Sequence, residues 1–192
     1  MPKIIGLRGK ARSGKDTVAS ILSGKGWTRK AFADQLKRSV GPLFGLSHDQ
    51  LNGADDSEAL DPREQVDPRW GKTPRVILQE CGEAWRKIHP DVWCKFVLAD
   101  IEELYREDDQ FVITDVRYKN EADMIRKMGG VMVHVVRPGA ESRTGRSHSS
   151  ETEMDSYKRY DFTIDNSKDI PHLERQVAEM LRTCAAALGK KQ

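Results

Sequence analysis

A glycine-bounded loop followed by a lysine stands near the start of the chain. Residues 9–17 read Gly-Lys-Ala-Arg-Ser-Gly-Lys-Asp-Thr, and this matches the spacing G-x-x-x-x-G-K of phosphate-binding loops. Glycines at both ends let the backbone amides face an anion, and a helix beginning at Lys15 adds the positive end of its dipole. Asp16 stands where such loops often carry a hydroxyl, which arrives one place later as Thr17. The loop therefore predicts a site for the phosphates of a nucleotide.

A second pair of charged residues follows the apolar segment 111–114. Asp115 could hold Mg²⁺ beside the phosphates, directly or through water, and Arg117 could bind a phosphate through both arms of its guanidinium. A salt bridge at the end of a strand is the alternative interpretation. The presence of a phosphate-binding loop in the same predicted sheet favours the site.

Two further segments carry residue types suited to a phosphorylated ligand. Residues 138–152 are rich in Gly, Ser, Arg and His, and the arginines at 143 and 146 predict a lid that excludes water and adds positive charge. A solvated basic loop is the alternative. His148 beside Ser149 invites comparison with hydrolases, but the segment lacks the G-x-S-x-G pattern.

The segment 75–93 combines Arg, Gln and Trp. Arg75 could bind a phosphate, Gln79 could recognise the edge of a base, and Trp85 could stack on it. Tryptophans at helical spacing are more often core residues. Packing therefore remains an equal alternative for Trp85 and Trp93.

Alternating strand and helix patterns must position these residues. Strands are predicted over residues 3–8, 28–32, 111–114, 131–136 and 162–164, and helices over 15–25, 34–44, 73–88, 90–107, 121–128 and 169–188. Residues 46–72 lack periodicity and predict an irregular connection. The alternation indicates an α/β fold with a parallel sheet and helices on both faces. Ligands of such sheets bind at the carboxyl ends of the strands.

Composition narrows the class of function. A chain of 192 residues fits one domain, and a net charge of +2 argues against nucleic acid as the main partner. The three cysteines are scattered, which indicates reduced thiols in a cytoplasmic protein. No apolar run is long enough to span a membrane. A cytoplasmic protein that acts on a small anionic ligand is expected.

Together these segments resemble the deoxynucleoside monophosphate kinases of tailed bacteriophages. The resemblance rests on residues 9–17, 73–93, 115–121 and 148–151. It implies a P-loop NTPase three-layer sandwich with a five-stranded parallel sheet in the order 2-3-1-4-5 and a mobile lid. It also implies one kinase domain over 1–192, with an acceptor-binding segment at about 46–107 and the lid at about 138–152. The implied reaction moves the γ-phosphoryl group of ATP to a deoxynucleoside monophosphate, with Mg²⁺, in a monomer or homodimer. For a phage gene the implied location is the host cytoplasm.

The resemblance and the residue types together define a candidate site. The candidate catalytic residues are Lys15, Asp16, Asp115 and Arg117. The candidate ATP-binding residues are Gly9, Arg12, Ser13, Gly14, Lys15, Asp16, Thr17 and Arg143. The candidate acceptor-binding residues are Arg75, Gln79, Trp85, Arg117 and Glu151. The candidate metal ligands are Asp16 and Asp115.

Two other functions fit parts of the pattern. Animal phosphomevalonate kinases share the Ser-Gly-Lys-Asp run of the loop, but they would not need Gln and Trp to recognise a base. A P-loop module that regulates a partner would hydrolyse ATP slowly and ignore small acceptors. The identity of the acceptor therefore separates these functions.

Overall fold

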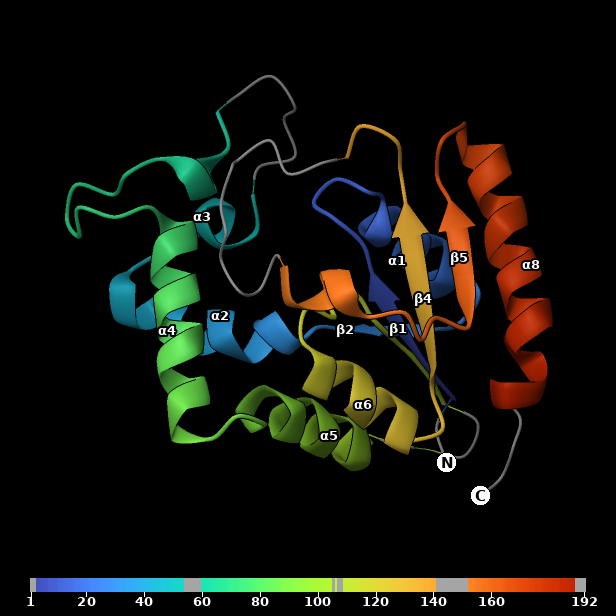
Figure 1. Cartoon of the computed structure of the whole chain (residues 1–192). Helices are drawn as coiled ribbons and strands as arrows, with labels where there is room; N and C mark the ends of the chain where they lie inside the picture. Colours follow the sequence, from blue (N-terminus) through green and yellow to red (C-terminus); the bar gives the residue numbers. More distant parts are fainter. Residues whose placement is uncertain (1–2, 54–59, 105, 107–108, 141–151, 189–192) are drawn as a thin grey trace. The chain divides into compact units, whose positions relative to one another are not determined.

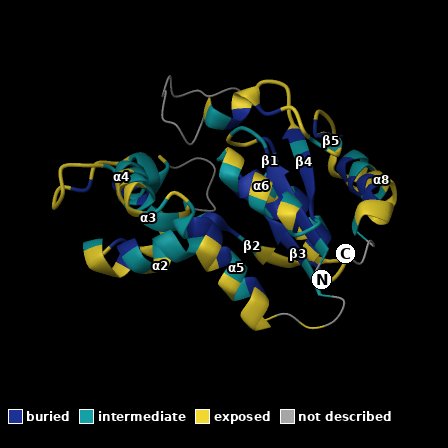
Figure 2. Ribbon diagram, turned by 60° about the horizontal axis from the view of Figure 1, so that its bottom comes forward, coloured by how far each residue is buried: buried dark blue, intermediate teal, exposed yellow. Residues whose placement is uncertain are grey.

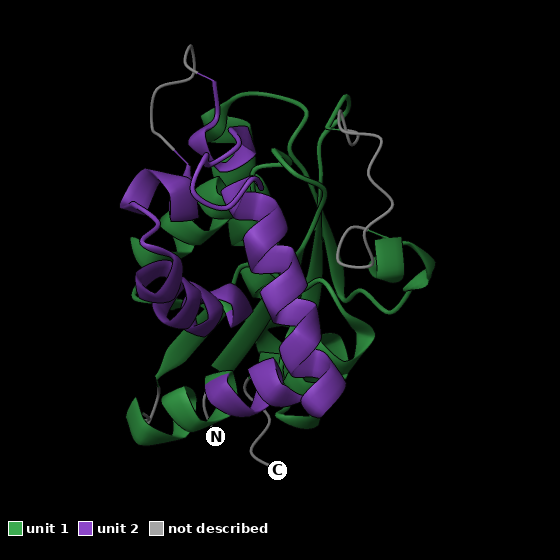
Figure 3. Cartoon of the chain, turned by 90° about the vertical axis from the view of Figure 1, so that its left-hand side faces the viewer, with its two compact units in different colours: residues 1–31, 97–192 green, residues 32–96 purple. Residues whose placement is uncertain are grey.

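The computed structural model describes residues 3–53, 60–104, 106, 109–140 and 152–188 (Figure 1). Contacts between Cα atoms divide the chain into two compact units, coloured separately in Figure 3. Unit 1 contains residues 1–31 and 97–192, and unit 2 contains Phe32–Phe96.

Unit 1 is built on a five-stranded sheet in which every neighbouring pair of strands is parallel. The strands are β1 (Lys3–Arg8), β2 (Thr28–Lys30), β3 (Gln110–Ile113), β4 (Val131–Val136) and β5 (Phe162–Asp165). Their order is β2-β3-β1-β4-β5, which confirms the predicted order. The central strand β1 is almost wholly buried, as are most residues of β3 and β4 (Figure 2). Burial on both faces explains why these strands read as continuous apolar runs.

Helices cover both faces of this sheet. The helices α1 (Lys15–Ser23) and α8 (Ile170–Leu188) pack on one face, where Leu7, Val18 and Val177 share a core. The helix α6 (Lys119–Lys127) packs on the other, where Ile125 lies against Gly6. The short 3₁₀ helix η2 (Glu153–Ser156) precedes β5. The predicted three-layer architecture is confirmed.

Unit 2 is helical. It contains α2 (Phe32–Phe44), α3 (His48–Asn52), the 3₁₀ helix η1 (Pro62–Glu64) and α4 (Pro74–Ile88). The helix α5 (Val92–Leu104) begins in unit 2 and ends in unit 1. The core of unit 2 gathers Val40, Leu46 and Ile77.

The expectation that residues 46–72 are irregular is wrong at two places, α3 and η1. Helix α3 forms because Ser47 and Gln50 make a capping box. The Gln50 amide donates to Ser47 Oγ at 3.2 Å, and the Ser47 amide donates to Gln50 Oε1 at 2.9 Å. The predicted start of α4 is confirmed, with Thr73 as its cap and Pro74 as its first residue.

Hydropathy gives a separate result. Across the described part of the chain, every helix is too short or too polar to cross a membrane.

Candidate active site

The loop of residues 9–17, called the P-loop below, connects β1 to α1. Gly14 caps α1 with φ of 96°, a left-handed conformation that glycine adopts without strain. At Gly9, an added Cβ would lie 2.5 Å from the carbonyl oxygen of Val135, so the close approach of β4 requires glycine. Ser13 is 1% exposed, and its hydroxyl has no hydrogen-bond partner among the described residues. The P-loop thus packs closely against the sheet.

Lys15 folds back over the P-loop. Its Nζ donates to the carbonyl oxygens of Gly9 and Lys10, both at 2.9 Å. These bonds hold the ammonium beside the loop amides, where outer phosphates bind in such loops. Asp16 lies exposed in the first turn of α1, and Thr17 is half-buried.

A buried asparagine from the opposite end of the chain supports the P-loop. Asn166 follows β5, and its Nδ2 donates to the carbonyl oxygen of Ser13 at 2.9 Å. The backbone amide of Asn166 donates to the carbonyl oxygen of Val136 at 2.8 Å. Asn166 therefore ties the P-loop to β4 and β5. Asn166 is not among the residues predicted from the sequence, although ligands were expected at the carboxyl ends of the strands.

The segment after β3 is shaped by a buried carboxylate. Glu121 is 1% exposed, and its Oε2 accepts from the amides of Arg117 at 2.7 Å and Tyr118 at 3.1 Å. The amide of Val116 donates to the carbonyl oxygen of Leu7 at 3.2 Å. These bonds hold the segment against the end of β1, directly beside the P-loop.

A small hollow, called the P-loop hollow below, forms where these segments meet. Its volume is about 20 Å³, and its lining residues are Arg8, Gly9, Ala11, Lys15, Asp115, Val116 and Arg117. The structure therefore brings together Lys15, Asp115 and Arg117, which the sequence proposed as catalytic. Asp16 and Thr17 belong to the adjoining turn of α1, and Arg12 is exposed on the P-loop.

An ion-pair cluster that was not predicted from the sequence lies at this edge of the sheet. Asp155 of η2 accepts from Arg8 Nη2 at 3.0 Å and from Lys10 Nζ at 2.7 Å. Nearby, the rings of His134 and Tyr160 stack with centroids 4.7 Å apart. Burial lowers the pKa of His134, and the positive charge of Arg8 lowers it further. Burial raises the pKa of Tyr160. Both rings are thus neutral neighbours of the charged cluster near neutral pH.

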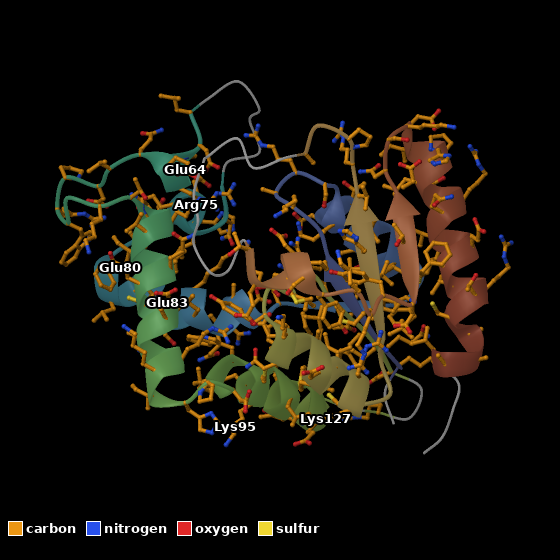
Figure 4. All side chains as sticks on the ribbon, in the orientation of Figure 1. Glu64, Arg75, Glu80, Glu83, Lys95 and Lys127 are labelled. Atoms are coloured by element: carbon orange, nitrogen blue, oxygen red, sulfur yellow. The ribbon has the colours of Figure 1, made fainter. Side chains whose placement is uncertain are left out.

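In unit 2, Arg75 is ion-paired with acidic residues of the η1 region. Its Nε lies 2.5 Å from Glu64 Oε1, and both residues are labelled in Figure 4. Its Nη2 lies 3.9 Å from Asp61 Oδ2. The pKa of Asp61 is lowered to about 2, chiefly by its hydrogen bond with Arg63 and to a smaller extent by Arg75. Arg75 therefore already has carboxylate partners.

The tryptophans of unit 2 pack on each other. The rings of Trp85 and Trp93 are stacked with centroids 5.1 Å apart. Trp93 is buried, and its Nε1 donates to the carbonyl oxygen of Gly82 at 3.3 Å. Trp85 and Gln79 are half-buried on α4. The packing alternative thus holds for Trp93, and the roles of Trp85 and Gln79 stay predictions.

Unit 2 also contains a larger hollow of about 560 Å³. It opens between α2 and α3, and its lining residues are Asp34, Lys37, Arg38, Gly41, Pro42, Gly45, Leu46, Leu51 and Asn52. Its charged and apolar walls could hold part of a small ligand.

Several predicted residues lie outside the described part of the chain. These are Arg143, Arg146, His148, Ser149, Ser150 and Glu151. The greater part of the predicted lid at 138–152 falls in the same segment, so the lid stays a prediction.

Comparison with known proteins identifies the family. The sequence profile of the deoxynucleotide monophosphate kinase family matches residues 84–177. A protein of Acanthamoeba polyphaga mimivirus, provisionally named a deoxynucleotide monophosphate kinase, is 35% identical over 187 residues, covering 91% of this chain and 93% of the relative. The deoxynucleotide monophosphate kinase of Escherichia phage RB69 is 31% identical over 91 residues, covering 47% of this chain and 36% of the relative.

The fold has a counterpart among solved structures. The dephospho-CoA kinase of Campylobacter jejuni superposes with a TM-score of 0.55 at 14% identity, covering 97% of this chain and 98% of that one. At this identity the likeness concerns the fold alone. The near full-length match to the mimivirus relative shows that this chain belongs to the deoxynucleotide monophosphate kinase family.

Proposed function

We propose that the chain transfers the γ-phosphoryl group of ATP to a deoxynucleoside 5′-monophosphate. An oxygen of the acceptor phosphate forms a bond to the γ-phosphorus, and the bond from that phosphorus to the bridging oxygen of ADP breaks. The products are ADP and the deoxynucleoside diphosphate. The observation that carries the proposal is the P-loop hollow, because it joins Lys15 of a nucleotide-binding loop to Asp115 and Arg117.

The residues of the hollow support this reaction electrostatically. Two phosphates must approach each other, so fixed positive charge is needed where negative charge develops. In the proposal, Lys15 exchanges its bonds to the carbonyls of Gly9 and Lys10 for oxygens of the γ-phosphate. Arg117 binds the acceptor phosphate from the segment that precedes α6. The amides of the P-loop and the first turn of α1 bind the remaining phosphates of ATP.

The donor atoms present fit a magnesium ion. Mg²⁺ prefers carboxylate, phosphate and water oxygens, and Asp115 lines the hollow beside Lys15, while Asp16 lies exposed on α1. The described residues contain no group of three or more His, Cys, Asp or Glu side chains that could hold a metal. Phosphate and water oxygens must therefore complete the coordination. When bound, Mg²⁺ would neutralise charge on the phosphates.

The proposal assigns recognition of the acceptor to the segment at about 46–107. Arg75, Gln79 and Trp85 all belong to α4 of unit 2. Arg75 serves the acceptor only if the phosphate replaces Glu64 and Asp61 as its partner. Otherwise Arg75 fixes η1 to α4, and its contribution is structural. The kinetics of an Arg75 variant separate these two roles.

The test is an ADP-release assay with ATP and Mg²⁺ on purified protein. The acceptors are the four deoxynucleoside monophosphates, the four ribonucleoside monophosphates and mevalonate phosphate. Activity with deoxynucleoside monophosphates is expected for the wild type, with a much lower kcat for Lys15→Ala. The Gln79→Ala variant should flatten the preference among bases, because a site that binds a base edge leaves polar groups unpaired with a wrong base.

Other outcomes point to the alternative functions. Preference for mevalonate phosphate would contradict the proposal and favour the phosphomevalonate kinase function. ATP hydrolysis that no acceptor accelerates would favour the regulatory module. The proposal further includes a cytoplasmic location. It also includes a monomer or a homodimer, and size-exclusion chromatography with light scattering would distinguish these two oligomeric states.

A further inference from the structure

A buried arginine stands directly before the P-loop. Arg8 is the last residue of β1, and its side chain is only 8% exposed. An arginine stays charged at any physiological pH, and a buried charge is costly unless it is paired and hydrogen-bonded. The environment of Arg8 therefore has to supply partners for its guanidinium.

The described protein residues satisfy this guanidinium incompletely. Arg8 Nη2 donates to Asp155 Oδ1 at 3.0 Å. Its Nε is buried and has no hydrogen-bond partner among the described residues. The carboxylate of Asp155 is about half exposed and is shared with Lys10 at 2.7 Å. A buried donor without an acceptor is unfavourable, so a partner supplied by a ligand would stabilise this arrangement.

Arg8 lies on the sheet face that carries α6. Successive residues of a strand point to opposite faces. Ile5 and Leu7 belong to the core with α1 and α8, so Gly6 and Arg8 face the other way. On that face, Gly6 has Val116 among its nearest neighbours. Arg8 is therefore on the side of the segment that carries Arg117, and the helix that begins at Lys15 is on the opposite side.

The charges around the P-loop hollow favour an anion. Arg8, Lys15 and Arg117 line it together with one carboxylate, that of Asp115. The hollow measures about 20 Å³, which is little more than the space for one water. A phosphate group therefore enters only if lining side chains move. Lys15, held by two backbone carbonyls, is one side chain that can exchange these bonds for phosphate oxygens.

We propose that Arg8 binds the phosphate of the acceptor nucleotide together with Arg117, and that Asp155 positions Arg8 for this contact. The inference rests on the proposed function. Arg8 Nε donates to an acceptor oxygen while Nη2 stays on Asp155. Because Asp155 also holds Lys10 of the P-loop, one carboxylate fixes the acceptor ligand relative to the loop that binds ATP.

The test uses the variants Arg8→Lys, Asp155→Asn and the double variant. Lysine keeps the charge and can pair with Asp155, but it cannot present two fixed N–H groups. Arg8→Lys should lower kcat/KM for the acceptor by about 10- to 100-fold, the range expected for one hydrogen bond to a charged group. The calorimetric Kd for ATP should stay unchanged. Asp155→Asn should raise the acceptor KM more than it lowers kcat.

Arg126→Lys is the matched control. Arg126 pairs with Asp161 at 3.0 Å in the last turn of α6, at the opposite end of the helix from Arg117. This variant also replaces the arginine of an arginine–aspartate pair with lysine, and it should change stability without changing the acceptor KM. The kcat/KM of the double variant of Arg8 and Asp155 should be no lower than that of Arg8→Lys alone, because both substitutions remove the same contact with the acceptor phosphate.

The result can overturn the inference independently of the proposed function. Acceptor kinetics of Arg8→Lys that match those of Arg126→Lys would show that Arg8 is structural only. An equal loss of affinity for ATP in Arg8→Lys would assign Arg8 to the site that binds ATP. If the wild type phosphorylates no nucleoside monophosphate, the proposed function fails. Calorimetry with inorganic phosphate, on protein already saturated with ATP, then tests the anion contact alone. Weaker binding to Arg8→Lys than to wild type supports that contact, and equal binding refutes it.

Discussion

The contact between Gly14 and Asn166 allows a quantitative test of how the P-loop is held. A Cβ at Gly14 would lie 2.1 Å from Asn166 Nδ2, and φ there is 96°. Gly26 has φ of 87°, but an added Cβ would meet nothing within 4 Å. The two glycines thus share a positive φ and differ in the space around them. Gly26→Ala measures the conformational cost alone, and Gly14→Ala adds the collision with Asn166.

The expected magnitudes follow from these contacts. A left-handed conformation costs a non-glycine residue about 1–2 kcal/mol, so Gly26→Ala should lower the free energy of unfolding by that amount. In Gly14→Ala, Asn166 must also move away from the carbonyl oxygen of Ser13. Leaving buried polar groups unpaired costs about 1–3 kcal/mol more. For a chain of this size, this difference corresponds to a further fall in Tm of roughly 2–12 °C.

Urea unfolding provides the free energies, and calorimetry provides the Kd for ATP. Gly26→Ala should bind ATP as the wild type does, whereas Gly14→Ala should bind it more weakly because the P-loop shifts. Adding Asn166→Ala to Gly14→Ala removes the collision. The losses of unfolding free energy in the two single variants, Gly14→Ala and Asn166→Ala, should therefore sum to more than the loss in the double variant. Equal stability and equal ATP affinity of the two single glycine variants would refute the role assigned to Asn166.

Four further predictions concern single side chains. Lys15→Ala should lower kcat by about 100-fold or more with little change in Tm, measured by steady-state kinetics and thermal unfolding. Asp115→Asn should raise the Mg²⁺ concentration needed for half-maximal activity. If the Mg²⁺ titration of this variant matches that of the wild type, Asp115 is a surface acid without a role in metal binding. Arg75→Ala should raise the acceptor KM if Arg75 binds phosphate, whereas a lower Tm with normal KM would show that it only holds η1. The pKa of Asp61 is lowered from 3.8 to about 2, chiefly by Arg63, so its stabilising effect is present above pH 3.8 and is lost as the pH falls to about 2. Asp61→Asn should therefore flatten that loss in acid unfolding curves.

Local patterns predicted most of the sheet. The strands β1, β3 and β4 are buried on both faces, so their apolar runs are visible without knowledge of the tertiary structure. The carboxyl-end rule then placed Asp115 and Arg117 near the P-loop, and the structure brings both to the P-loop hollow with Lys15.

Other features depend on contacts that the sequence does not display. Arg8 reads as the end of a strand, and its burial becomes apparent only when Asp155 is placed beside it. Asn166 follows the last strand, so the rule for strand ends could have included it. The capping pair Ser47 and Gln50 was a readable signal for α3, but the surrounding polar residues obscured it.

The register of the central strand has a consequence for how the chain is made. Lys3 pairs with Gln110 and Ile5 pairs with Val131, so β1 leaves the ribosome long before either neighbouring strand exists. Unit 2, by contrast, takes its core from residues 32–96 alone, and contacts of low sequence separation form early. We therefore expect the helical unit 2 to collapse first. Meanwhile the nascent β1 remains an unpaired apolar strand, which avoids aggregation only through chaperones or through fast synthesis and folding of the later strands.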